Sequence, residues 1–257
     1  MLFTKNAVFS DNVRKQLTIQ SYLDSRGFTI ISTGNTNDKY LLSSLLDLSE
    51  RIVNLQMNGG EKFIKYIRTS IIHKTSQCSF SLAKLSDAEK KATIDIANEL
   101  CSFGILTKSS VIKNDILDGS FNFTARFSKF ISGEFLEIAV YKLVLTLLED
   151  LKSRVDDLDY EVLTNVIATN KQFQREYDLF LRLKDQVFLF EMKSGRAEDF
   201  AYYYTKGVEL GLYPDNLFVV LSDRTHEELE LLTHFHEMNI TNYAKLHDIL
   251  ISLFNNY

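Results

Sequence analysis

The chain has 257 residues, of which 45% are hydrophobic and 25% are charged, values that exclude wholesale disorder and fibrous repeats. The length favours one or two domains. A formal net charge of −5 argues against a protein that coats nucleic acid by bulk charge, but it is compatible with an enzyme that has a local basic groove.

Cys78 and Cys101 are too few for a disulfide framework or a structural zinc site, so a reducing cytoplasm is the expected location. The N-terminus has no apolar core followed by a cleavage site. The most apolar stretch, residues 138–148, contains Lys142 and is shorter than the roughly 20 residues that span a bilayer. We expect a cytoplasmic protein without a membrane partner.

Residues 1–75 are expected to form a small α/β unit. Asp11 is a suitable N-cap for a first helix, and Gly27 ends it. The alternation of helices and strands that follows favours a parallel sheet. The expected elements are a strand at 28–32, a helix at 41–49, a strand at 52–55 and a helix from Gly59 to residue 72.

Residues 76–130 are expected to form a winged-helix-like connector. A helix is predicted at 88–103. Residues 106–127 then alternate polar and apolar side chains around Asp118-Gly119, a pair typical of hairpin turns. A helix followed by such a hairpin is the arrangement of a winged helix. A plain connector of one helix and one hairpin is the alternative.

Residues 131–257 are expected to form an α/β domain with the order αβββαβ and two trailing helices. The continuous apolar run at 217–221 fits a strand that is buried on both faces. The other expected elements are a helix at 134–152, strands at 160–168, 176–183 and 187–193, and helices at 197–212, 225–238 and 244–254.

Two acidic side chains on neighbouring strands of this domain suggest a metal site. If residues 184–185 form a two-residue turn, the strand register places Asp178 opposite Glu191, with Lys193 on the same face. Facing carboxylates repel unless a cation lies between them, and hard oxygen ligands suit Mg²⁺ or Mn²⁺. The alternative is an exposed strand end where Glu191 and Lys193 form an ion pair.

This arrangement resembles the PD-(D/E)XK nuclease superfamily over roughly residues 133–221. The resemblance implies that Asp178 and Glu191 hold the metal together with the backbone carbonyl of Met192. It also implies that Lys193 orients or activates the attacking water. A metal in such a site lowers the pKa of water and stabilises the charge that builds up on the phosphate.

Residues 126–137 are similar to the entry of the nuclease domain in the CARF-nuclease family of type III CRISPR systems. In that family a Gly-x-Trp-Leu-Glu pattern starts the first core helix, and its Glu reaches the active site. The matching residues are Gly133 and Glu137, with Phe135 in place of the Trp. The resemblance implies a homodimer in prokaryotic antiviral defence, activated by a cyclic oligoadenylate, that cleaves DNA, RNA or both.

The match is weaker in the N-terminal part. Residues 53–62 are similar to the family's strand-to-helix turn, Asn-x-Thr-Gly-Gly-Thr-Lys, but both Thr are absent. Gly59-Gly60 can present backbone N–H groups to a phosphate or form a tight turn, and the sequence favours the turn. Residues 1–75 are therefore interpreted as a shortened or divergent sensor, or as no sensor.

Three further residues are candidates for nucleic-acid binding. Lys206 lies on the helix after Glu191, where the resemblance implies a basic residue that contacts the substrate phosphate. Gln172 and Arg175 precede the strand that carries Asp178 and could touch the nucleic-acid backbone, or could be solvated loop residues.

The sequence therefore predicts a metal-dependent nuclease. Two other functions remain open at this point. One is a restriction- or transposon-type endonuclease that cleaves duplex DNA. The other is a non-catalytic protein whose winged helix binds DNA or a protein partner, which the acidic net charge mildly favours.

Overall fold

The computed structural model describes residues 17–34, 39–112, 115–195, 199–222 and 224–255. It contains a six-stranded sheet and a smaller antiparallel sheet. The six-stranded sheet has the order β1 (Thr29–Ser32), β5 (Tyr160–Thr169), β6 (Gln174–Leu183), β7 (Gln186–Lys193), β8 (Leu217–Leu221) and β9 (Asn239–Asn242). The small sheet has the order β2 (Gln77–Ser81), β4 (Ile116–Phe121) and β3 (Leu106–Ile112).

Helices surround both sheets, so the chain has the expected α/β architecture. They are α1 (Ile19–Ser25), α2 (Lys39–Leu55), α3 (Glu61–Ile72), α4 (Asp87–Ser102), α5 (Ala125–Lys129), α6 (Phe135–Arg154), α7 (Phe200–Leu210), α8 (His226–His236) and α9 (Tyr243–Phe254). Two π-helical turns, η1 (Gln56–Gly60) and η2 (Phe130–Glu134), lead into α3 and α6. Among the described residues, no helix is long and apolar enough to cross a bilayer.

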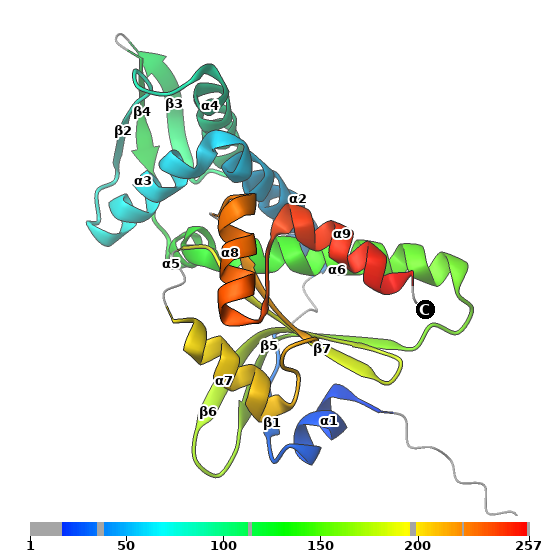
Figure 1. The fold of residues 1–257 in the computed structure, drawn as a ribbon. Helices are drawn as coiled ribbons and strands as arrows, with labels where there is room; N and C mark the ends of the chain where they lie inside the picture. Colours follow the sequence, from blue (N-terminus) through cyan, green and yellow to red (C-terminus); the bar gives the residue numbers. More distant parts are fainter. Residues whose placement is uncertain (1–16, 35–38, 113–114, 196–198, 223, 256–257) are drawn as a thin grey trace, which may run out of the picture.

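Two apolar cores cover the two faces of the six-stranded sheet. The α7-side core joins the sheet to α1, α7 and α8. The α6-side core joins it to α2, α6 and α9, and continues past α6 to the small sheet, which Figure 1 shows on the far side of α6. All of β8 is buried, because its side chains alternate between the two cores. The prediction of a strand buried on both faces is confirmed.

The αβββαβ order from α6 to β8 is also confirmed. Leu183 pairs with Gln186, as the two-residue turn requires, and Lys184 in that turn has a left-handed φ of 52°. The antiparallel pairs continue as far as Leu179 and Phe190. After α7 the chain returns parallel to β7, so the carboxyl ends of β7 and β8 lie side by side.

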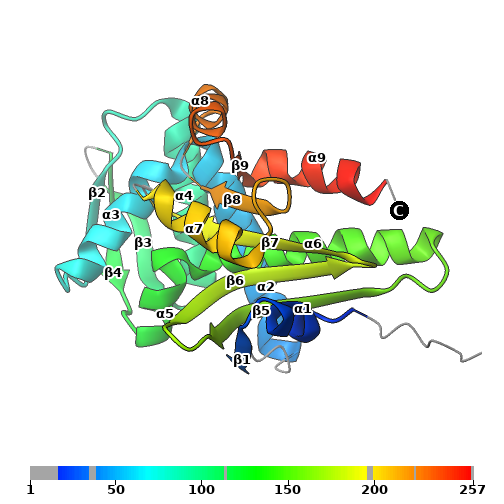
Figure 2. The same ribbon diagram turned by 60° about the horizontal axis from the view of Figure 1, so that its bottom comes forward.

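The N-terminal part differs from the prediction in two ways. Residues 52–55 are the end of α2 and not a strand, because Leu48 and Ile52 are one helical turn apart and both pack into the α6-side core. The expected parallel sheet is absent from the described residues of this part. Instead β1 pairs antiparallel with β5 at the edge of the six-stranded sheet, where Figure 2 shows it beside α1.

The predicted hairpin exists, but its turn is elsewhere. Asp118 and Gly119 lie within β4, paired with β2 on one side and β3 on the other. Strand β3 ends at Ile112, which pairs with Ile116 at the start of β4, and Asp115 just before β4 has a φ of 55°. The alternating pattern continues through β4, the middle strand of the small sheet, so the Asp-Gly pair does not form a turn.

Two further findings concern helix ends. The helix predicted at 225–238 ends at His236, is capped by Glu237 with a left-handed φ of 51°, and is followed by the short strand β9. The described part of the first helix is α1, capped by Thr18. Asp11, the predicted cap, lies outside the described residues.

Candidate active site

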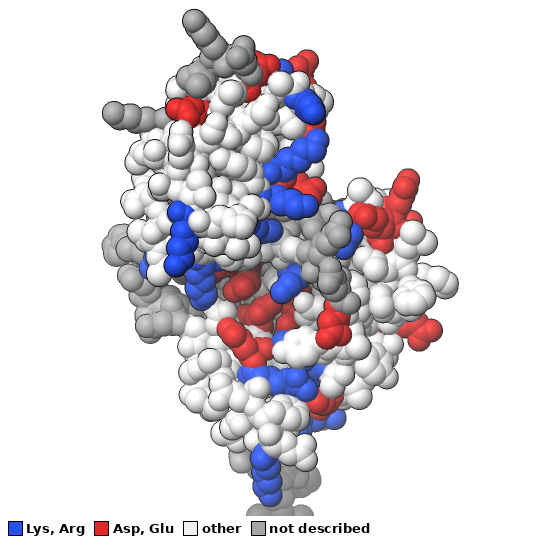
Figure 3. Space-filling view, turned by 90° about the vertical axis from the view of Figure 1, so that its left-hand side faces the viewer, with Lys and Arg blue, Asp and Glu red and all other residues white. Residues whose placement is uncertain are grey.

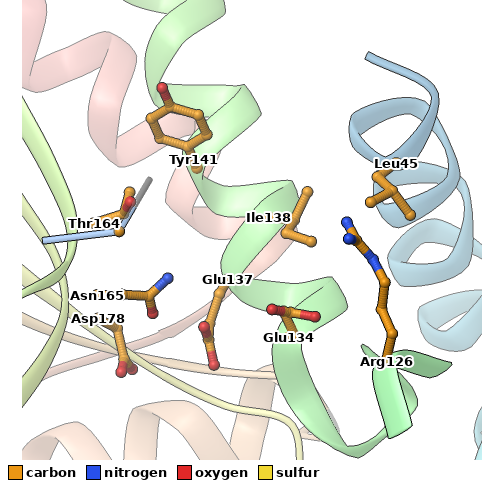
Figure 4. A pocket seen from close by; sticks show the side chains of 10 residues that line it. Leu45, Arg126, Glu134, Glu137, Ile138, Tyr141, Thr164, Asn165 and Asp178 are labelled. Atoms are coloured by element: carbon orange, nitrogen blue, oxygen red, sulfur yellow. The ribbon is translucent and has the colours of Figure 1, made fainter. Parts of the chain in front are cut away.

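A cleft of about 180 Å³ lies between the start of α6 and the middle of β5 and β6. Glu137 and Tyr141 of α6 lie across it from Asn165 and Asp178 of the sheet, and Glu134 of η2 and Arg126 of α5 line the part away from Asp178 (Figure 4). Figure 3 shows acidic side chains gathered in a hollow of one face, with basic side chains around them. The structure thus brings Glu137 and Asp178, 41 positions apart in sequence, to one cleft.

A local irregularity in the sheet turns Asp178 into this cleft. Leu163 and Val166 of β5 both face the α7-side core, although residues three apart in a regular strand face opposite sides. On β6, Tyr177 faces the α7-side core and Leu179 the α6-side core, although they are two apart. Asn165 lies at the same level with a left-handed φ of 47°, a conformation that asparagine tolerates.

The carboxylates of Glu137 and Asp178 lie close enough for their negative charges to repel one another. Burial raises the pKa of Glu137 to about 7, and the negative charge of Asp178 contributes to this rise. Burial also raises the pKa of Asp178, although Oδ2 accepts a hydrogen bond from the Met192 amide at 2.7 Å. Neighbouring groups of like charge in a partly buried cleft are a common feature of functional sites.

Glu191 follows Phe190 at the register position next to Asp178, but its side chain has a different environment. It is 3% exposed and points toward α7, where Oε2 accepts a hydrogen bond from Lys206 Nζ at 2.6 Å. Its other oxygen, Oε1, is buried and has no hydrogen-bond partner. Burial and the charge of Asp178 raise the pKa of Glu191 to about 8, against the opposing effect of Lys206.

The register alone implied that the two carboxylates share one face, but only Asp178 lines the cleft, whereas Glu191 lies beside it and faces α7. The irregularity at Asp178 moves that side chain toward α6, whereas Glu191 keeps the regular alternation of β7 and faces α7. Lys193 is exposed at the end of β7, and its charge lowers the pKa of Asp178. Within the described residues, no three His, Cys, Asp or Glu side chains are grouped so that they could hold a metal ion.

The residues predicted to contact nucleic acid are placed as follows. Lys206 is 3% exposed, and its ammonium is bound to Glu191 and to the Glu176 carbonyl at 2.7 Å. Arg175 forms a two-bond ion pair with Glu209, at 2.9 and 2.8 Å, and lies 4.3 Å from the centre of the Phe173 ring. Gln172 is exposed in the turn between β5 and β6.

Gly59 and Gly60 form a packed turn between α2 and α3. Gly59 has a left-handed φ of 112°. A Cβ on Gly60 would lie 2.2 Å from Ile96 Cδ1 of α4 and 2.8 Å from the Leu55 carbonyl oxygen. This close packing explains why glycine is needed there.

Sequence reasoning missed two residues of the cleft, Asn165 and Arg126. Asn165 interrupts an otherwise β-branched and apolar strand pattern, a weak signal for an irregular position. Arg126 belongs to α5, a five-residue helix that was not predicted.

Comparison with known proteins gives a match at the level of structure. No family model matches the sequence, and no curated protein matches it. The fold is similar to that of VC1899 from Vibrio cholerae, with a TM-score of 0.61 and 17% identity. It is also similar to that of Can2 from Sulfobacillus thermosulfidooxidans, solved in complex with cyclic tetra-adenylate, with a TM-score of 0.61 and 13% identity.

The chain shares its fold with these two proteins. The similarity extends over 93% of this chain in both comparisons. It extends over 61% of each neighbour, so the chain spans less than two thirds of their length.

Proposed function

We propose that the chain is a divalent-metal-dependent nuclease that hydrolyses phosphodiester bonds of DNA, RNA or both. One observation carries the proposal. Asp178 lies close enough to Glu137 on one side and Glu191 on the other that its charge raises the pKa of both carboxyls. Asp178 thus repels two buried carboxylates, which a cation would stabilise, and hard oxygen donors suit Mg²⁺ or Mn²⁺.

The available donor atoms are carboxylate and carbonyl oxygens, the ligand type that such an ion prefers. Asp178 would bind through Oδ1, since Oδ2 accepts the Met192 amide, and Glu191 through its unpartnered Oε1. The Met192 carbonyl completes the proposed oxygen set. When bound, the metal would lower the pKa of water and offset negative charge on the phosphate.

The chain's own residues have distinct roles in this proposal. Lys193, exposed at the end of β7, would orient the attacking water or stabilise charge at the phosphate. Glu137 would take up a proton from the attacking water, because a pKa of about 7 lies near the working pH. Lys206 would hold Glu191 in place through its ion pair.

The test is a cleavage assay with Mg²⁺ or Mn²⁺ on single-stranded and duplex DNA and RNA. Asp178→Asn, Glu191→Gln and Lys193→Met should each lower the cleavage rate by about 100-fold or more. Asp185→Asn is the matched control, because Asp185 is exposed in the turn of the same hairpin. Unchanged cleavage in Asp178→Asn and Glu191→Gln would overturn the proposal.

We also propose that a cyclic oligoadenylate activates cleavage and that the chain acts as a homodimer in prokaryotic defence. The structural match to Can2, solved with cyclic tetra-adenylate, supports the activator. Cleavage rates with cyclic tetra-adenylate, compared with a linear oligoadenylate, test this step, and light scattering tests the dimer. Sequence-specific duplex cleavage without any activator would instead favour a restriction- or transposon-type endonuclease.

The ion pair between Lys206 and Glu191 favours one other function. A carboxylate already neutralised by a buried ammonium can be a purely structural group in a non-catalytic protein that binds DNA or another protein. Absence of Mn²⁺ binding in calorimetry, together with absence of cleavage on every substrate, would favour that function.

A further inference from the structure

A second cavity, of about 410 Å³, lies beyond the carboxyl ends of β7 and β8. Its volume is in the range of small-ligand sites, and crevices at the carboxyl ends of parallel strands are frequent binding places. Gly195, two residues after Lys193, forms part of its wall, and η1, α3 and residues 224–228 around the start of α8 form the rest. None of the roles assigned above uses this cavity.

Gln56 provides the observation that points to a ligand. The residue is 3% exposed and lines the cavity. Its Nε2 donates a hydrogen bond to Ser222 Oγ at 3.2 Å, but its Oε1 is buried and has no hydrogen-bond partner. Leaving a buried acceptor unpaired is unfavourable. A ligand with a donor group would therefore supply the hydrogen bond that Gln56 Oε1 lacks.

The charged side chains around Gln56 favour an anion. Lys65, Arg68 and Arg224 line the cavity together with two acids, Glu61 and Glu228. Glu228 and Arg224 pair with one another at 3.3 Å, and Glu228 also accepts a hydrogen bond from the Thr225 amide at 2.9 Å, so Lys65 and Arg68 outweigh the remaining acid, Glu61. The positive end of the α8 dipole adds to the three basic groups.

Arg68 links this cavity to the proposed active site. Its Nε donates a hydrogen bond to the Ile131 carbonyl of η2 at 2.9 Å, and its Nη1 donates to the carbonyl of Ser194, the residue after Lys193. The same π-helical turn contributes Glu134 to the carboxylate cleft. One arginine therefore contacts both the turn that carries Glu134 and the residue that follows the Glu-x-Lys strand.

We propose that this cavity binds a phosphate group of a nucleic-acid strand whose neighbouring part lies in the carboxylate cleft. The inference rests on the proposed function and adds a substrate subsite to it. The phosphate would pair with Lys65 and the two arginines. A sugar hydroxyl or base N–H of the same nucleotide would donate to Gln56 Oε1.

The test measures binding in EDTA, so that no cleavage occurs. Labelled single-stranded DNA and RNA oligonucleotides are titrated with the wild-type chain, Lys65→Ala and Gln56→Leu. Each variant should weaken binding about fivefold, and Lys65→Ala should reduce the salt dependence by about one counterion. Lys62→Ala is the control, since Lys62 is exposed on the same helix but does not line the cavity.

Inorganic phosphate and adenosine monophosphate form the second arm, because a free nucleotide carries the same phosphate chemistry. Suppose that the monophosphate binds as tightly as the oligonucleotide, and that Lys65→Ala and Gln56→Leu weaken the binding of the monophosphate but not of the oligonucleotide. This result would overturn the proposal of a strand subsite. Unchanged oligonucleotide binding in both variants also overturns it.

Failure of the nuclease proposal would look different. The wild-type chain would bind the oligonucleotides in EDTA, with the stated dependence on Lys65 and Gln56, but would not cleave them when Mg²⁺ or Mn²⁺ is added. Loss of cleavage alone therefore bears on the carboxylates, and loss of binding in Lys65→Ala bears on the cavity.

Discussion

Lys206 Nζ lies 2.6 Å from Glu191 Oε2, and both side chains are at most 4% exposed. The ammonium also donates a hydrogen bond to the Glu176 carbonyl and lies about 5 Å from the ring centres of Tyr177 and Tyr202. Helix α7 thus fixes the carboxylate of the Glu-x-Lys strand through one buried cation.

Removing that cation should destabilise the fold. Lys206→Met leaves the Glu191 carboxylate buried without its partner, and we expect the free energy of unfolding to fall by about 3 kcal/mol. Urea denaturation measures the change. The double variant Lys206→Met/Glu191→Gln should recover part of the loss, because it also removes the buried charge.

Lys193→Met is the matched control, since Lys193 is exposed at the end of the same strand. Its unfolding free energy should stay within about 0.5 kcal/mol of the wild type. Equal effects of the two lysine substitutions would contradict a structural ion pair.

Glu137 should make the stability depend on pH. Its carboxyl has an ordinary pKa of 4.5 in the unfolded chain and a pKa of about 7 in the fold. The folded state therefore binds the proton more tightly. The contribution of Glu137 to the unfolding free energy is therefore highest below pH 4.5 and falls as the pH rises from about 4.5 to about 7.

Glu137→Gln removes this fall and should be more stable than the wild type at pH 8 by about 2 kcal/mol. Denaturant titrations of metal-free protein across this pH range measure it. Glu149→Gln is the control on the same helix, because Glu149 is exposed. An identical pH profile in Glu137→Gln and wild type would refute the assignment.

Asn165 should tolerate glycine but not a β-branched residue. Its φ of 47° is accessible to glycine, whereas valine in this conformation costs about 1–2 kcal/mol. Asn165→Val should therefore lower the melting temperature and, by restoring regular alternation next to Asp178, reduce cleavage. Asn165→Gly should keep the fold, and equal behaviour of both variants would show that the backbone irregularity is unimportant.

Gly60→Ala should destabilise the junction of α2 and α3. The added Cβ would press against the Leu55 carbonyl and the end of Ile96, and such overpacking costs about 1–3 kcal/mol. Adding Ile96→Val removes the closest atom, Cδ1, and should restore part of the unfolding free energy. A fully stable Gly60→Ala single variant would argue against this packing.

The parts of the fold that local patterns determine were predictable. The register of β6 and β7 follows from two alternating runs separated by two residues, and the burial of β8 follows from its unbroken apolar sequence. The pairing of β1 with β5 could not be predicted, because its partners are more than 130 positions apart and no local periodicity encodes such a pairing.

For the site, the sequence correctly predicted that β6 and β7 are neighbours, but it did not predict which face of the sheet each acidic side chain occupies. The irregularity at Asn165 separates Asp178 from the environment of Glu191. The burial of Lys206 had a usable signal. Tyr203 and Leu210 lie one turn on either side of it, so helical spacing places Lys206 on the apolar face of α7.

The pairing of β1 with β5 also determines which fragments of the chain can fold without the rest. Four residues near the start of the chain occupy the hydrogen-bonding edge of the sheet that carries Asp178 and Glu191. A fragment beginning at residue 131 would present the backbone of β5 to solvent as an open edge, and such edges recruit strands from other molecules. Expression trials of the C-terminal half alone should therefore yield aggregated protein, and supplying residues 17–34 as a separate peptide should improve its solubility.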